Sequence, residues 1–246
     1  MDEILIYVAI GFAAQMVDGA IGMAYGITAT SVLLRAGIPP AMASACVHAA
    51  ETVTTAASGA AHWRLGNIDR KLLWRLAIPG VIGGAIGAYA LSEFPGDTLK
   101  PFIAVYLVLL GVVIIWKALL KPIKEAPPPR SVAPLGFFGG MFDAIGGGGW
   151  GPIVTSSLIG RGTAPRYAIG SVNLAEFFVT LTISATFFVT IGLDLWPIIA
   201  GLIVGGVVAA PFAALAAKHI PAKALMLIVG CVVIGLSLRT LVLSLQ

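Results

Sequence analysis

Residues 136–152 read GFFGGMFDAIGGGGWGP, and residues 11–27, placed 125 positions earlier, read GFAAQMVDGAIGMAYGI. The two stretches share Gly, Phe, Met, Asp, Gly and Gly at six matching positions. Ten further identities keep this register without a gap as far as Thr55 and Thr180. Identity held at one fixed offset over this length indicates that the chain contains a duplicated unit.

The composition is typical of a chain that is surrounded by lipid. Of the 246 residues, 59% are hydrophobic and 11% are charged, and the mean hydropathy is +1.00. The 15 Lys and Arg residues are scattered at the ends of apolar segments, which argues against a nucleic-acid-binding patch. We therefore expect an all-α integral membrane protein. A duplicated apolar chain favours a transporter whose site lies between two related halves.

Six segments are each long enough to cross a hydrocarbon core, which needs roughly 20 helical residues. They are residues 41–62, 71–92, 99–120, 167–191, 195–217 and 222–243. The opening segment of each half differs, because Asp18–Gly22 interrupts the first and Asp143–Gly149 interrupts the second. Glycine destabilises a helix interior by roughly 0.8–1 kcal/mol relative to Ala. We expect each opening segment to be two half-helices joined by a glycine-rich loop at membrane depth.

The basic residues favour one topology over another, because Lys and Arg accumulate in cytoplasmic loops. If each broken segment is re-entrant, the two halves have opposite orientations and only Arg35, Lys100 and Arg239 lie outside, against twelve basic residues inside. If each broken segment crosses the membrane, the protein has eight spans and parallel repeats, and the split becomes nine against six. We expect inverted repeats, with eight spans and parallel repeats as the alternative.

The duplication also sets the expected domain organisation. Residues 1–125 form the first membrane repeat, residues 126–130 a proline-rich cytoplasmic linker, and residues 131–246 the second membrane repeat. Each repeat is a re-entrant or broken hairpin with a Gly-rich loop, followed by three transmembrane helices. Small residues recur within 80–88 and 201–210, where they allow helices to approach closely in lipid. We expect one fold unit.

Two aspartates lie at the glycine loops. Ionisable side chains at membrane depth are costly, so each marks a candidate functional position. We expect Asp18 and Asp143 to accept hydrogen bonds from loop amides and to hold the turns open. Such bonds would give both residues a structural role beside any contact with a ligand.

The helix after each loop carries a polar face. Residues spaced i, i+3 and i+7 share one side of a helix, and these positions hold His48, Glu51 and Thr55 in the first half and Asn173, Glu176 and Thr180 in the second. Burial favours the neutral form of a carboxyl group, so His48, Glu51 and Glu176 are candidates for coupling transport to protons. An interhelical hydrogen bond is the alternative role for His48, because its counterpart Asn173 does not titrate.

The glycine loops favour anion chemistry. A half-helix that begins after the loop directs unpaired N–H groups and its positive dipole end towards the midplane. Glycine lets a ligand approach that backbone, and Tyr25 and Trp150 could form the walls of a pocket. The expected substrate-binding residues are Asp18, Gly22, Tyr25, Gly26, Asp143, Gly146, Gly147, Gly148, Gly149, Trp150, Gly151 and Asn173. We expect no cofactor and no metal.

An intramembrane enzyme and an anion channel are the alternatives to a carrier. An intramembrane enzyme could use Ser44 and His48, spaced i and i+4, as nucleophile and base. The second half has Ile169 and Asn173 there and no nucleophile motif, so we expect no enzyme. An anion channel would use a similar polar constriction without alternating access.

The duplicated motif resembles that of the sulfite exporter TauE/SafE family of integral membrane transporters, and the resemblance covers nearly the whole chain. Membership implies transport of small sulfur-containing anions, such as sulfite or organosulfonates, across the bacterial cytoplasmic membrane by a multi-pass protein of that inner membrane. The first copy departs from the glycine pattern, with Ile21, Met23 and Ala24 in place of Gly146, Gly148 and Gly149.

Overall fold

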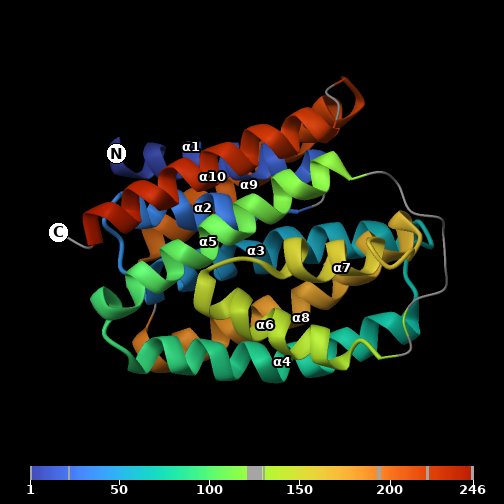
Figure 1. The fold of residues 1–246 in the computed structure, drawn as a ribbon, viewed down its shortest axis with the longest axis horizontal. Coiled ribbons are helices and arrows are strands. Elements are labelled where there is room, and N and C mark those ends of the chain that lie inside the picture. The colour runs from blue at the N-terminus through green and yellow to red at the C-terminus, as the bar shows by residue number, and fades with distance from the viewer. Residues whose placement is uncertain are drawn as a thin grey trace.

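A computed structural model describes residues 2–21, 23–120, 129, 131–192, 195–219 and 222–244, and these ranges are helical apart from short connections (Figure 1). The first half contains α1 (Asp2–Ile21), α2 (Tyr25–Arg35), α3 (Pro40–Arg64), α4 (Arg70–Glu93) and α5 (Gly96–Leu119). The second contains α6 (Ala133–Gly146), the π-helical turn η1 (Gly151–Thr155), α7 (Ser156–Ile159), α8 (Pro165–Ile191), α9 (Trp196–His219) and α10 (Ala222–Ser244). The prediction of an all-α protein is confirmed.

The secondary structure repeats with the sequence. The helix α3 begins at Pro40 and α8 begins at Pro165, and α1 and α6 end at Ile21 and Gly146, which are the same positions in the 125-residue register. Proline is favoured in the first turn of a helix because that turn needs no N–H donor. The expected linker 126–130, apart from Pro129, lies outside the described residues.

Both opening segments are broken where the glycine loops were expected. The first break separates α1 from α2, and Ala24 just before α2 has a positive φ of 89°. In the second, Gly147 ends α6 with φ of 67°, and Gly148 and Gly149 follow with φ of 144° and 147°. The last two values are rarely accessible to residues with a side chain, so glycine is required there. The sequence therefore placed both breaks to within a few residues. The expected interruptions began too early, because Asp18–Ile21 and Asp143–Gly146 are still helical.

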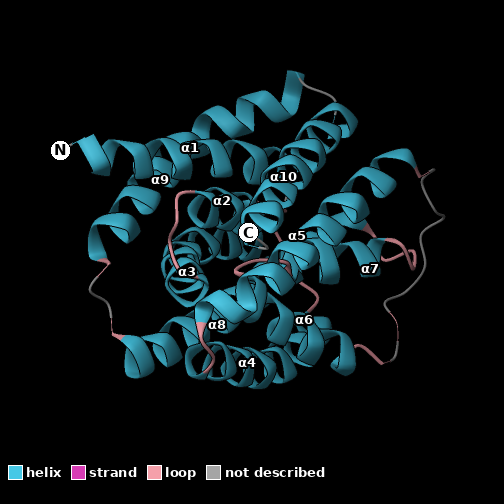
Figure 2. Ribbon diagram, turned by 60° about the vertical axis from the view of Figure 1, so that its left-hand side comes forward, coloured by secondary structure: helices cyan, strands magenta, loops and turns pink. Residues whose placement is uncertain are grey.

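Each half packs its opening helix against the other half. Figure 2 shows α1 beside α9 and α4 beside α6. Along the first pair, Gly201 lies against Ile4 and Tyr7, and Gly205 lies further along against Phe12, so the two helices run parallel. The two halves are therefore interlocked.

The other helix pairs also have definite directions. Gly136 lies against Leu76 and Gly140 against Gly80, so α6 runs parallel to α4. Asn173 of α8 donates to Ser58 of α3 at 3.1 Å. Further along α8, Ser184 lies 3.4 Å from Thr52, which is earlier in α3, so α3 and α8 are antiparallel.

Large apolar side chains cover the outside of the bundle. On α4 they recur every three or four residues and are about half exposed: Trp74, Ile78, Ile82, Ile86 and Tyr89. A stripe of this size would be unfavourable in water and is suited to lipid. Among the described residues, four helical stretches are long and apolar enough to span a membrane: Arg70–Glu93, Thr98–Leu119, Pro165–Ile191 and Met226–Ser244. The protein is therefore an integral membrane protein.

The two other expected spans, 41–62 and 195–217, are helical but differ in character. The helix α3 buries His48, Glu51 and Thr55 and packs against α8, α9 and α2. In α9 the strongly apolar part is the shorter stretch Trp196–Ala210. Because α3 is covered by other helices, it needs less hydrophobicity than a helix that faces lipid.

The close approach of α4 and α6 can be tested with one added methyl group. A Cβ atom on Gly140 would lie 3.0 Å from the carbonyl carbon of Gly80, which is too close, whereas a Cβ on Gly235 of α10 meets nothing within 4 Å. We expect Gly140→Ala to destabilise the protein by about 1–3 kcal/mol. Gly235→Ala should leave stability equal or raise it, because alanine favours helix. Thermal unfolding in detergent measures both, and equal melting temperatures would contradict the packing explanation.

Candidate functional site

The tips of the two broken segments touch each other. A Cβ atom on Gly26, at the start of α2, would lie 2.7 Å from the Cα of Gly148 and 3.2 Å from the carbonyl oxygen of Gly147. The Thr30 hydroxyl of α2 donates to that same Gly147 oxygen. The structure thus brings together the loops of both halves, which are 122 residues apart at Gly26 and Gly148. Gly22 lies outside the described residues.

Each aspartate accepts a hydrogen bond from the first amide of the following half-helix. Asp143 Oδ1 accepts from the Trp150 N–H at 2.8 Å, and Asp18 Oδ1 accepts from the Tyr25 N–H at 3.3 Å. Both aspartates therefore accept backbone hydrogen bonds as expected, and their role in holding the turns stays a prediction. A carboxylate is favoured there because the N-terminal amides of a helix are unpaired and carry partial positive charge. The carboxyl groups of Asp18 and Asp143 therefore bond to the same amides that we expected to bind an anion.

The second oxygen of Asp143 contacts a histidine from the other half. His48 Nε2 lies 3.2 Å from Asp143 Oδ2, and His48 Nδ1 lies 2.8 Å from the Ser44 carbonyl oxygen. The Ser44 hydroxyl donates to the Ala144 carbonyl at 2.6 Å. All of these side chains are buried, and His48 is 0% exposed. The interhelical hydrogen bond expected for His48 is therefore present.

Among the described residues, Asp18 has no equivalent histidine partner. Asn173 takes the place of His48, and its amide donates to Ser58 on α3. Ile169 takes the place of Ser44. Asp18 is also less buried than Asp143. The duplication is thus symmetric in backbone but asymmetric in titratable side chains.

Glu51 and Glu176 complete a group of acidic residues around the tips. Glu51 is 5% exposed, and its Oε2 has no hydrogen-bond partner among the described residues. The carboxyl groups of Asp143 and Asp18 are close enough to interact with Glu51 and Glu176. Among the described residues, no Lys or Arg forms an ion pair with these carboxyl groups. An anion that binds beside them would therefore require carboxyl groups to be protonated.

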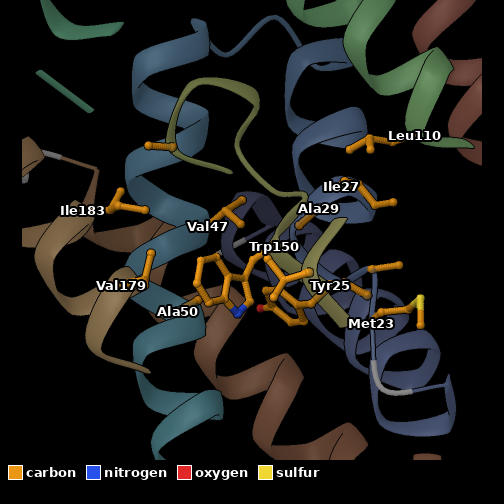
Figure 3. Close-up of a cluster of buried hydrophobic side chains, with 14 of the residues drawn as sticks. Met23, Tyr25, Ile27, Ala29, Val47, Ala50, Leu110, Trp150, Val179 and Ile183 are labelled. Carbon is orange, nitrogen blue, oxygen red and sulfur yellow. The ribbon is translucent and has the colours of Figure 1, made fainter. Parts of the chain in front are cut away.

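Tyr25 and Trp150 lie in the core in this conformation. Figure 3 shows the two rings pointing towards one another, next to Val179 and Ala50. The Tyr25 hydroxyl donates to the Leu202 carbonyl at 3.2 Å, and the Trp150 indole donates to the Val172 carbonyl at 3.2 Å. Trp150 is 0% exposed. Tyr25 and Trp150, which we expected to form the walls of a pocket, therefore pack against other protein atoms in this structure.

Sequence reasoning missed two side chains of α5 that support the second loop. The Tyr106 hydroxyl donates to the Gly148 carbonyl at 3.2 Å, and its ring fills the space where Gly146 would carry a Cβ. Lys117 Nζ donates to the Pro152 carbonyl in η1 at 2.7 Å. The sequence did offer one sign of this role, because Tyr106 is the one tyrosine in the apolar segment 99–120 and carries a hydroxyl group there. In the structure, Tyr106 covers Gly146 and Gly149, Thr30 covers Gly147, and Gly26 covers Gly148. Gly151 is buried at the start of η1.

The Tyr106 contact can be tested by hydrogen exchange. Tyr106→Phe removes the hydroxyl bond to Gly148 but keeps the ring, so we expect local opening of residues 146–150 to become easier by about 1 kcal/mol. That corresponds to roughly fivefold faster amide exchange by mass spectrometry. Tyr89→Phe is the control, because Tyr89 is 56% exposed on the outer face of α4. Unchanged exchange in Tyr106→Phe would show that the loop does not depend on this bond.

Comparison with known proteins identifies the family. The family model described as Sulfite exporter TauE/SafE matches residues 7–240. The chain is also 42% identical over 251 residues to the probable membrane transporter protein YtnM of Bacillus subtilis (strain 168), covering 98% of this chain and 84% of that relative. These relationships indicate a transporter and not an enzyme, and the buried Ser44 hydroxyl is bonded to a carbonyl group. The chain belongs to the TauE/SafE sulfite exporter family of membrane transporters.

Proposed function

We propose that this protein carries small sulfur-containing anions, either sulfite or an organosulfonate, across the bacterial cytoplasmic membrane by alternating access. The substrate site lies near the bilayer midplane, between two inverted repeats. The observation that carries the proposal is the contact between the two hairpin tips, with an aspartate bonded to the first amide of each half-helix. The family match supports the substrate class.

The helix directions support inverted repeats. The helices α3 and α8 occupy equivalent positions in the two halves, and they are antiparallel. The helix α2 is joined to α3 by four residues, 36–39, and Gly26 lies beside Glu51 in the middle of α3, so α2 runs back along α3. This geometry agrees with a re-entrant opening segment. Repeats of opposite orientation allow one half to open towards each side in turn.

The charges support an orientation in the membrane. The right-hand end of Figure 1 contains the junction of α3 and α4, the end of α5 and the start of α8. Arg64, Arg70, Lys71 and Arg166 lie at these places. Because positive residues favour the cytoplasmic side, this end faces the cytoplasm, and both ends of the chain lie towards the opposite side.

Anion binding requires the tips to separate. With Gly26 against Gly148, the loop backbone is covered by protein, so the structure corresponds to a closed state. When the tips part, the amides of Tyr25 and Trp150 can exchange an aspartate oxygen for a substrate oxygen. Glycines of both loops and Asn173 then line the site, and His48, Glu51 and Glu176 provide for proton coupling. Backbone dipoles bind the anion without a buried Lys or Arg.

Flux measurements in proteoliposomes test this function. We expect labelled sulfite and methanesulfonate to enter with saturable kinetics and to compete with each other, because both present three sulfur-bound oxygens to the same amides. Transport of neither anion would contradict the substrate class and leave the family assignment standing. Flux that rises linearly with concentration would indicate an anion channel instead.

A large side chain placed between the two hairpin tips tests the location of the substrate site. Gly26→Leu places a side chain where a Cβ already meets Gly148, and we expect flux to fall by about tenfold or more, equivalent to about 1.4 kcal/mol or more. Gly235→Leu is the matched control, because it adds the same side chain at an open position on α10. Gel filtration verifies that both variants are folded. Parental flux in a folded Gly26→Leu variant would place transport elsewhere.

A further inference from the structure

Each ring nitrogen of His48 has a possible hydrogen-bond partner. A carbonyl oxygen only accepts, so the 2.8 Å contact with the Ser44 carbonyl is a hydrogen bond only when Nδ1 carries a proton. The 3.2 Å contact between Nε2 and Asp143 Oδ2 requires a second proton between these atoms. A neutral imidazole beside a carboxylate supplies only one of the two. With a proton on each ring nitrogen, the His48–Asp143 pair makes both contacts, holds one extra proton and has no net charge.

Removing that proton has a consequence for the second hairpin. The neutral imidazole that remains keeps its Nε2–H bond to Asp143, and its bare Nδ1 then needs a donor. The nearest is the Ser44 hydroxyl, 3.2 Å away, which now donates to the Ala144 carbonyl. If the hydroxyl turns to Nδ1, α3 loses its bond to Ala144, next to Asp143 near the end of α6. The pair also changes from neutral to a charge of −1.

We propose that the His48–Asp143 pair binds the single proton that accompanies each transported anion, and that Ser44 couples this proton to the second hairpin. The inference rests on the proposed anion transport. An anion approaching the Trp150 amide meets a neutral pair when the proton is bound and a negative pair when it is not, so anion and proton bind together. For a monovalent anion the coupled transport is electroneutral. The proton leaves to water when the site opens.

The surrounding groups are consistent with one such site. The other titratable groups that interact with the charge of Asp143 are Glu51 on α3, Glu176 on α8 and Tyr106 on α5. None of them has a basic partner among the described ion pairs. In the other half, Asp18 has Asn173 and Ile169 in place of the histidine and serine. The described residues therefore contain one such His–Asp pair, and the proposal assigns one proton to each anion.

Accumulation in proteoliposomes measures this stoichiometry. The probe is labelled methanesulfonate, which stays ionised near neutral pH and does not itself carry protons. The vesicle interior is one pH unit more alkaline than the medium, and potassium with valinomycin holds the membrane potential at zero. One proton per anion predicts about tenfold accumulation inside, and two protons predict about a hundredfold. Accumulation of about a hundredfold, or none despite downhill flux, would overturn the inference.

Two variants and a control assign the proton to the pair. His48→Asn introduces the residue that the other half carries and should reduce the accumulation ratio to about one, because no titratable ring remains. Ser44→Ala keeps the ring but removes the donor that a deprotonated Nδ1 needs, so its ratio should also fall towards one. His62→Asn makes the same change at the cytoplasmic end of α3 and should accumulate like the parent.

The outcomes separate the two proposals. Parental accumulation in either His48→Asn or Ser44→Ala would show that the coupling proton binds elsewhere. Downhill methanesulfonate flux without accumulation in the parent would leave anion transport standing and remove the proton site. Absence of any flux of sulfite or methanesulfonate in the parent would remove the proposed function, and the inference with it.

Discussion

Two chain breaks meet inside a membrane protein, and each break leaves backbone amides without helical partners. In hydrocarbon such groups have no water to bond with, and each unpaired group costs several kcal/mol. Asp143 and Asp18 meet this requirement by accepting from the first amides of the half-helices. Thr30 and Tyr106 donate to the loop carbonyls of Gly147 and Gly148. The rest of the fold is arranged around keeping this polar centre covered.

Glycine serves two different physical purposes in this protein. In the second loop, Gly148 and Gly149 adopt φ values that side chains exclude. Elsewhere glycine allows close packing, as where Gly140 faces the backbone of Gly80. In lipid, where apolar burial gives little advantage, close backbone contact is a main source of helix association. The interlocking of α1 with α9 and of α4 with α6 depends on such contacts.

The asymmetry between the halves matters as much as their similarity. The backbone breaks and the aspartate bonds are repeated, but among the described residues a histidine contacts Asp143 and none contacts Asp18. The second hairpin is also tied to α5 by Tyr106 and Lys117. The duplication gives two related hairpins, and divergence of a few side chains places a histidine beside the aspartate of one of them.

The sequence by itself determined the helical class, the duplication and the approximate positions of both breaks, because these depend on local composition and on glycine at fixed places. It also placed Asp18 and Asp143 as partners of loop amides, since a short acidic side chain before a helix bonds to nearby N–H groups. It did not determine that Tyr25 and Trp150 would lie in a packed core. Nor did it identify Tyr106 and Lys117, which reach the second hairpin from α5.

The tertiary structure decided which groups are partners across long separations. His48 meets Asp143, and Gly26 meets Gly148, only because the two halves interlock. Periodicity places a side chain on a face of its own helix but carries no information on the helix opposite. The Ser44 carbonyl beside His48 Nδ1 lies one turn earlier in the same helix, but the carboxyl group beside Nε2 comes from α6. Only the packing of α6 against α3 therefore gives His48 an acidic partner.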